Sequence, residues 1–199
     1  MEPTSSAYPV RFTFDPPEHV ARWRPLVSWL LAIPHFVILY FVQILAEVCV
    51  FIGWFAILFT GKLPAGLARF PVMLIRYQTR VMTYSMFLQE EYPPFEFPSD
   101  GTDMGDYPRM RVDMEPELTD RNRVTTFFRP LLLIPHVVAI VFLGIAAAFV
   151  LLIAWFAVLI TGRWPDGLRD FLLGYFRWAT RLNGYALLLT DEYPPFSME

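Results

Sequence analysis

The sequence predicts a mainly α-helical integral membrane protein made of two tandem copies of one unit. Of its 199 residues, 55% are apolar and only 18% are charged, and the mean hydropathy is +0.41. A soluble domain normally carries about 25% charged residues, so this composition favours a membrane protein. From residue 33 to residue 95, 28 of 63 positions are identical to the residue 101 places further on, which indicates an internal duplication.

The two copies share short motifs in the same order. They are Ile-Pro-His at 33–35 and 134–136, Trp-Phe-Ala at 54–56 and 155–157, Thr-Gly at 60–61 and 161–162, and Tyr-Pro-Pro-Phe at 92–95 and 193–196. Residues 96–106, rich in Pro, Ser, Asp and Gly, are typical of a linker. We therefore divide the chain into a first membrane repeat unit (8–95), a linker (96–106) and a second membrane repeat unit (107–196).

Each unit begins with a short β-strand pattern. Val10, Phe12 and Phe14 alternate with Arg11 and Thr13, and residues 110–114 repeat the alternation. Such alternation predicts a half-buried strand. Because neither strand is stable alone, pairing across the duplication is one way to stabilise both.

Each strand pattern is followed by a long apolar run, 25–61 in the first unit and 130–162 in the second. A straight helix of this length would reach about 50 Å, whereas the hydrocarbon layer is about 30 Å thick. Basic residues flank both runs on both sides: Arg22, Arg24, Lys62 and Arg69 for the first, and Arg121, Arg123, Arg129, Arg163 and Arg169 for the second. Because positive flanks stay in the cytoplasm, this pattern predicts an apolar helical hairpin. The strand region, the linker and the C-terminus then lie on the cytoplasmic side, and the alternatives are a re-entrant hairpin or one long kinked helix.

A hairpin also explains how the first run can contain an acidic residue. Glu47, near Gln43, would lie at a turn close to the far interface, because an ionised acid at the bilayer centre costs about 3 kcal/mol. The alternative is a buried functional carboxylate. Pro34 and Pro135 are expected to kink or begin the first membrane helix of each unit.

The third segment of each unit, 66–89 in the first copy, predicts an amphipathic helix. At 100° per residue, Arg69, Arg76 and Arg80 fall within about 40° of one another, and Arg177 and Arg181 keep the same i, i+4 spacing in the second copy. A narrow polar stripe on an apolar helix is typical of an interfacial position, with arginines reaching lipid headgroups. A specific site for anionic lipid or for protein docking is the alternative.

The motif Glu-Tyr-Pro-Pro-Phe ends both units. Two prolines stop a helix and impose an extended backbone. The aromatic residues Tyr92 and Phe95, and Tyr193 and Phe196 in the second copy, can then anchor at the interface. A polyproline-type ligand motif is the functional alternative.

The shared motifs, taken in order, resemble the prokaryotic membrane family known as domain of unknown function 4389. The motifs that carry the likeness are Arg-x-Arg, Ile-Pro-His, Trp-Phe-Ala-x-Leu-x-Thr-Gly, Pro-x-Gly-Leu, Arg-x-x-Thr-Arg and Tyr-Pro-Pro-Phe. The likeness covers nearly all of both copies. It implies a multi-pass protein of a bacterial cell (inner) membrane and carries over no catalytic residues.

No constellation of residues predicts a chemistry. His35 and His136 are the best candidates for acid–base work or metal binding, but no Asp, Glu or Cys is duplicated with them, so we expect no metal and no cofactor. A structural role beside the preceding proline is favoured, with each histidine bonding freed backbone or meeting its twin. No phosphate-binding loop, nucleophile elbow or metalloprotease motif is present.

The sequence therefore favours a non-catalytic membrane module. A net charge of −3 argues against nucleic acid as a partner. The expected partners are membrane lipids, together with a protein partner or further copies of the chain in the membrane. A scaffold, an accessory subunit of a membrane complex and a bilayer-shaping module all fit this description. The alternative is a lipid or amphiphile transporter or binding protein, since many transporters are internal repeats.

Overall fold

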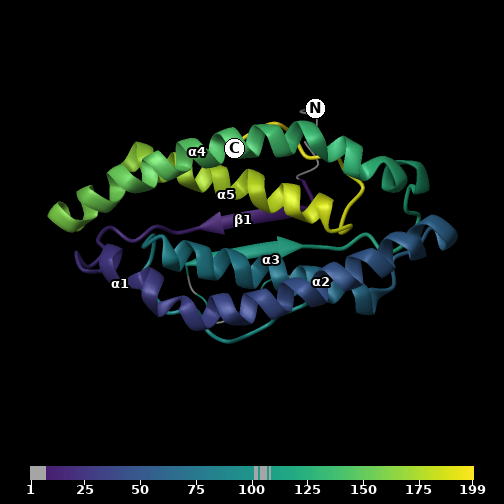
Figure 1. Ribbon diagram of the computed structural model, residues 1–199, viewed down its shortest axis with the longest axis horizontal. Helices are drawn as coiled ribbons and strands as arrows, with labels where there is room; N and C mark the ends of the chain where they lie inside the picture. The colour runs from purple at the N-terminus through teal and green to yellow at the C-terminus, as the bar shows by residue number, and fades with distance from the viewer. Residues whose placement is uncertain (1–7, 101–102, 104–106, 108) are drawn as a thin grey trace, which may run out of the picture.

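The computed structural model describes residues 8–100, 103, 107 and 109–199. In chain order its elements are β1 (Val10–Phe14), α1 (Arg24–Leu31), α2 (Ile33–Thr60), α3 (Ala65–Ser85), β2 (Met110–Met114), α4 (Arg123–Thr161) and α5 (Asp166–Ala186). Figure 1 shows a flat, lens-shaped molecule with two strands in the middle, α3 and α2 on one side of them, and α5 and α4 on the other. Part of the expected linker, residues 101, 102 and 104–106, lies outside the described residues.

The predicted helical hairpin is wrong, because neither apolar run turns back on itself: the first forms α1 and α2, which meet at Ala32, and the second forms the single helix α4. In the first copy α2 runs for 28 residues without a turn, and in the second α4 runs for 39 residues. The supposed turn residues Gln43 and Glu47 are one helical turn apart, and their side chains are joined by a 2.7 Å hydrogen bond. Glu47 is exposed on the helix, neither at a turn nor buried. Pro34 stands in the first turn of α2, so it begins a helix as expected, whereas Pro135 lies inside α4. The alternative of one long helix therefore holds for the second copy, and the first copy has a break at Ala32.

The Thr-Gly motif ends both long helices and joins the two copies. Gly61 and Gly162 each have φ of 70°, a left-handed conformation that glycine adopts without strain at a helix C-terminus. The carbonyl of Gly61 accepts a hydrogen bond from the backbone N–H of Arg121, and that of Gly162 accepts one from Val20. The end of the long helix in each copy therefore bonds the segment that leads into the first helix of the other copy.

The two strands pair with each other across the duplication, as the alternation suggested. β1 and β2 are antiparallel, with Phe12 opposite Val112 at the centre of the pairing. β1 packs on α5 of the second copy and β2 packs on α3 of the first, so the strand of each copy packs on a helix of the other. The ring of Phe12, for example, stacks at 6.0 Å from that of Phe176 on α5. The main core is thus shared between the copies and cannot form from one alone.

The Trp-Phe-Ala motif makes the reciprocal contact at the ends of the molecule. The indole N–H of Trp54 donates to the carbonyl of Thr126 at the start of α4, and that of Trp155 donates to the carbonyl of Pro25 at the start of α1, both at 2.9 Å. Since Pro25 and Thr126 are also 101 residues apart, the two bonds are equivalent. The copies are related by a pseudo-two-fold axis through the strand pair, with α2 and α4 running in opposite directions (Figure 1).

Candidate functional site

The Ile-Pro-His and Tyr-Pro-Pro-Phe motifs of the first copy meet around a buried histidine. The ring of His35 stacks on Phe95 at 4.4 Å and lies 4.7 Å from the ring of Tyr92. Its Nδ1 atom is 2.6 Å from the hydroxyl of Tyr77 on α3. His35 is completely buried, so the imidazole closes an aromatic cluster between α2, α3 and the segment that follows α3.

The second copy repeats this cluster with a tryptophan in place of the tyrosine on α5. His136 stacks on Phe196 at 3.9 Å and lies 4.8 Å from the ring of Tyr193. The indole N–H of Trp178 donates to Nδ1 of His136 over 3.2 Å. An imidazole nitrogen that accepts this bond carries no proton, so the ring is neutral in this geometry.

The tyrosines of both clusters, and not the histidines, bond the backbone next to the prolines. The hydroxyl of Tyr92 donates to the carbonyl of Leu31 at 3.3 Å, and that of Tyr193 donates to the carbonyl of Leu132 at 3.2 Å. Each carbonyl lies three residues before the proline of its motif. The expectation that the histidines meet each other or bond freed backbone is therefore replaced by one aromatic cluster in each copy, into which Tyr92 and Tyr193 reach from the extended segment.

The arginine stripe of α3 is covered by protein, which corrects the headgroup interpretation for two of its members. Arg76 and Arg80 are both fully buried. Nε of Arg76 donates to the carbonyl of Val112 on β2 at 2.9 Å. Nη2 of Arg80 forms a 2.6 Å ion pair with Asp103, whose other carboxylate oxygen accepts from the backbone N–H of Val112. The stripe thus fixes β2 and Asp103, which precedes it, onto α3.

The other stripe arginines lie nearer the surface. Arg69 is exposed near the start of α3, and Arg177 is half-buried on α5. Nη2 of Arg181 donates to the carbonyl of Ser197 at 2.6 Å, so the C-terminal segment folds back over α5 as Pro98 and Asp103 do over α3. Burial lowers the pKa of the Arg181 guanidinium. Of the five predicted arginines, only Arg69 projects freely.

A second arginine cluster was not anticipated from the sequence. Arg121 and Arg129 both form ion pairs with Asp191, at 2.7 and 2.5 Å, while their own side chains are 0% and 2% exposed. Burial raises the pKa of Asp191. The hydrogen bonds from Arg121 and from the backbone N–H of Asn122, together with the positive charges of Arg121 and Arg129, have a larger opposite effect, so the pKa of Asp191 lies below its ordinary value. The first copy has Ser28 where the second has Arg129. An arginine that is present in only one of the two copies is the sequence feature that could have indicated this cluster.

The buried charged side chains in the described part of the chain all bond to other protein groups: Arg76, Arg80, Asp103, Arg121 and Arg129. Among these residues, no group of three or more His, Cys, Asp or Glu side chains lies close enough to hold a metal ion. The predicted residues Pro34, His35, Tyr92 and Phe95 come together, and so do their four counterparts, but the two clusters lie in separate copies. The sequence motifs are thus engaged in contacts within the protein.

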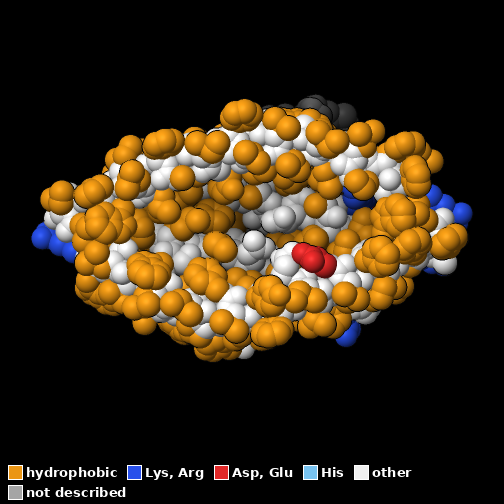
Figure 2. Space-filling view, viewed as in Figure 1, with side chains coloured by type: hydrophobic (Ala, Val, Ile, Leu, Met, Phe, Trp, Pro, Cys, Tyr) orange, Lys and Arg blue, Asp and Glu red, His pale blue; other side chains and the backbone are white. Residues whose placement is uncertain are grey.

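Apolar side chains cover much of the remaining surface. Large hydrophobic residues are exposed along α1, α2 and α4, whereas α3 and α5 expose none in their described residues. The most exposed are Phe59 (75%), Ile160 (71%), Phe142 (69%), Phe51 (66%) and Val124 (66%). Figure 2 shows this apolar surface over most of one face, with a hollow and an acidic side chain near the centre and basic side chains at the two ends. By length and composition, α2 and α4 are both long and apolar enough to cross a membrane.

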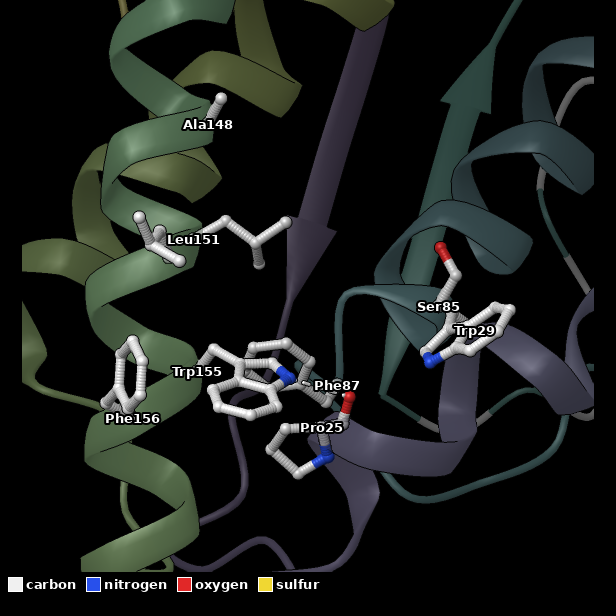
Figure 3. Close-up of a pocket in the computed structure, with 9 residues that line it drawn as sticks. Pro25, Trp29, Ser85, Phe87, Ala148, Leu151, Trp155 and Phe156 are labelled. Atoms are coloured by element: carbon white, nitrogen blue, oxygen red, sulfur yellow. Dashed lines mark hydrogen bonds between the residues drawn. The ribbon is translucent and has the colours of Figure 1, made fainter.

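An apolar pocket opens on this surface between α1 and α4. It has a volume of about 460 Å³, within the range of about 300–1,000 Å³ usual for small-molecule sites. Figure 3 shows Trp29 from α1 and Trp155 and Phe156 from α4 around it, with Ser85 and Phe87 at the end of α3. Its lining is almost entirely apolar, which suits an alkyl chain rather than a polar solute.

Comparison with known proteins identifies one family. The family described as a domain of unknown function, DUF4389, matches residues 22–96 and 123–198, which are the two copies. No curated protein matches the chain, and no solved structure does.

Proposed function

We propose that this chain, which belongs to the DUF4389 family, is a non-catalytic membrane module that either acts as a scaffold or accessory subunit of a membrane complex or shapes the bilayer around it. The observation that carries the proposal is the continuous exposed apolar surface of α1, α2 and α4. Exposed apolar patches on soluble monomers rarely exceed a few hundred Å², and larger ones mark contact with protein or membrane. Basic side chains at both ends of this surface suit the headgroups of anionic lipids.

The use of the shared motifs supports a structural role. The histidines, the tryptophans and the buried arginines all bond within the protein, and each joins elements that are distant in sequence. Catalytic groups, by contrast, are normally placed where a substrate can reach them. The residues that the two copies share therefore stabilise the fold that positions the exposed apolar helices. The expected location is a bacterial cell membrane.

Vesicle flotation with a matched pair of variants tests this proposal. Phe142→Asp places a charge at one of the most exposed apolar positions of α4, while Thr13→Asp places the same charge at an exposed position of β1. The native protein and Thr13→Asp should float with phosphatidylcholine and phosphatidylglycerol vesicles and resist extraction by salt. Phe142→Asp should bind measurably less. A native protein that stays monomeric in water without detergent and leaves the vesicles bare would refute the proposal.

Purification from native membranes in mild detergent separates the two forms of the module. A stoichiometric partner protein would identify an accessory subunit, and a homo-oligomer that retains lipid would identify a bilayer-shaping assembly.

The pocket of Figure 3 favours lipid or amphiphile binding as a second candidate function. Its indole and phenyl rings can hold an alkyl chain beside the exposed apolar surface. Leu151→Trp would fill the pocket, since Leu151 points into it from α4. A fluorescent fatty acid should then bind the native protein and lose affinity for this variant. Equal binding to both proteins would exclude the pocket as its site.

A further inference from the structure

The molecule has two unlike faces. In the strands, Val10 and Phe12 of β1 and their counterparts in β2 are buried against α5 and α3. Arg11, Thr13 and Arg111 point the other way and are exposed. The helices α2 and α4 pack on α3 and α5, and neither makes substantial contact with a strand. The layers therefore run from a polar sheet surface, through α3 and α5, to the apolar helices α2 and α4.

The polar sheet surface lies at the middle of the long helices. The strands run along the long axis in the centre of the molecule (Figure 1). The pseudo-two-fold axis passes through the Phe12–Val112 pair, midway between the equivalent bonds of Trp54 and Trp155. If α2 and α4 crossed a bilayer along their axes, the exposed charges of Arg11 and Arg111 would lie near its centre. Ionisable side chains at that depth are rare and face the interior of a bundle, whereas these face outward.

Basic residues are divided evenly between the ends of the molecule. Arg123 approaches Gly61 at one end, beside the exposed Lys62, and Arg22 approaches Gly162 at the other, beside the exposed Arg163. Figure 2 shows blue side chains at both ends of the apolar face. A crossing protein keeps most of its flanking Lys and Arg on the cytoplasmic side. The even division gives no preference for either end, so it does not fit helices that cross the membrane.

We infer that α2 and α4 lie in the plane of the membrane, at the boundary between the headgroups and the acyl chains of a single leaflet, with the outer surface of the sheet facing water. The exposed Glu47 of α2 is tolerated better at this boundary than at the bilayer centre. The inference deepens the proposed function and rests on it, because it specifies how the apolar surface meets the bilayer. The basic residues at both ends then reach headgroups of the same leaflet. The 39 residues of α4 cover about 58 Å, which is nearly twice the hydrocarbon thickness but unrestricted in the membrane plane.

Depth measurements along α2 test this orientation. Phe41, Val48 and Phe55 are exposed on one side of the helix and seven residues apart. Each would be changed to cysteine in a Cys49→Ser background, labelled with bimane and quenched by nitroxides at known depths in phosphatidylcholine and phosphatidylglycerol vesicles. A helix in the membrane plane gives the same depth at all three positions. A crossing helix places neighbouring positions about 10 Å apart in depth, with the middle one deepest, and that result would overturn the inference.

Side-specific labelling provides an independent measurement. Glu18→Cys and Lys62→Cys mark the two ends of the molecule, and Thr13→Cys marks the sheet surface. In right-side-out and inverted bacterial membrane vesicles, an impermeant maleimide should reach all three from the same side. Labelling of the two ends from opposite sides, with Thr13→Cys unreactive, would overturn the inference while leaving the membrane proposal intact.

The unmodified protein offers a third measurement in case a cysteine variant fails to fold. Oriented circular dichroism of aligned bilayers should place the helices parallel to the membrane plane, since the four long helices follow the same axis (Figure 1). A signal from helices along the membrane normal contradicts the inference. Failure of the native protein to enter any membrane is a different outcome, because it refutes the proposed function itself.

Discussion

The ion pairs of Asp191 provide the sharpest test of how the repeat is held together. Asp191→Asn keeps the shape of the side chain but leaves Arg121 and Arg129, which are almost completely buried, without their common counterion. Removing one partner of a buried ion pair costs about 3–5 kcal/mol. Both guanidinium groups keep backbone carbonyls as acceptors, among them those of Leu188 and Tyr185. We therefore expect the lower end, about 3 kcal/mol.

The duplication supplies a matched control at the equivalent position of the first copy. Glu90 accepts a hydrogen bond from the backbone N–H of Ala21, as Asp191 does from Asn122. Within the described residues Glu90 forms no ion pair. Glu90→Gln should therefore cost no more than about 1.5 kcal/mol, the upper value for one hydrogen bond.

Thermal unfolding in mild detergent, followed by circular dichroism, measures both variants. For a chain of this size 1 kcal/mol corresponds to about 2–4 °C, so Asp191→Asn should lower Tm by about 6–12 °C. Equal losses in Asp191→Asn and Glu90→Gln, or no loss in either, would refute the assignment of the stabilisation to the two arginines.

The pH dependence of the same variant has a defined sign. Because the pKa of folded Asp191 lies below its ordinary value of 3.8, its contribution to stability is complete above that value and is lost as the pH falls through the lower, folded value. The Tm of the native protein should therefore decline below about pH 4, and the difference between it and Asp191→Asn should shrink there. A difference that stays constant into strong acid would contradict the ion-pair explanation.

Three further substitutions follow from the paired contacts. His136→Asn removes the stack on Phe196, while the Asn amide oxygen can still accept from the indole of Trp178, so it should lower the free energy of unfolding by about 1 kcal/mol. The metal content, measured by plasma mass spectrometry, should be below one per chain before and after the change. Trp155→Phe removes one inter-copy hydrogen bond and should cost about 1 kcal/mol in chemical unfolding; a loss near zero would show that the bond is not formed. Gly162→Ala forces a side chain into left-handed backbone and should cost about 1 kcal/mol, visible as a lower Tm.

The duplication made the strands and the ends of the long helices predictable, because each residue could be compared with its counterpart in the other copy. The strand alternation around Phe12 and Val112 gave the correct strands, and pairing followed from the instability of either alone. The glycine of each Thr-Gly motif marked the true end of a long helix at Gly61 and Gly162. These features depend on local sequence, which is why sequence alone identified them.

The arginine stripe was misread for a physical reason. Spacing shows that Arg76 and Arg80 share a helix face, but it does not show what covers that face. The cover comes from residues about twenty positions later, where Asp103 and the carbonyl of Pro98 fold back onto α3. A buried arginine and a headgroup-facing arginine have the same helical periodicity, so only the tertiary structure separates them.

The hairpin prediction failed on an assumption about orientation. It took basic residues at both ends of a run to mean that both ends lie on one side of the membrane, and then required a turn between them. A helix that lies in the membrane plane also has both ends on one side, without any turn. The continuous helices α2 and α4 remove the need for a turn, and the charge pattern that suggested the hairpin becomes an argument for the orientation inferred above.

The two copies also differ in a way that distinguishes lipid contact from protein docking. At some equivalent exposed positions the side chains differ in shape but stay apolar: Phe51 stands where the second copy has Leu152, and Phe59 where it has Ile160. Others, such as Phe41 and Phe142, are identical, and Glu47 is the exception that is not apolar. The inward-facing tryptophan of each helix, in contrast, is the same in both copies. A protein interface requires complementary shapes, because its packing matches that of protein interiors. Fluid acyl chains impose no such requirement and need only an apolar surface, which both copies retain at Phe51 and Leu152 and at Phe59 and Ile160.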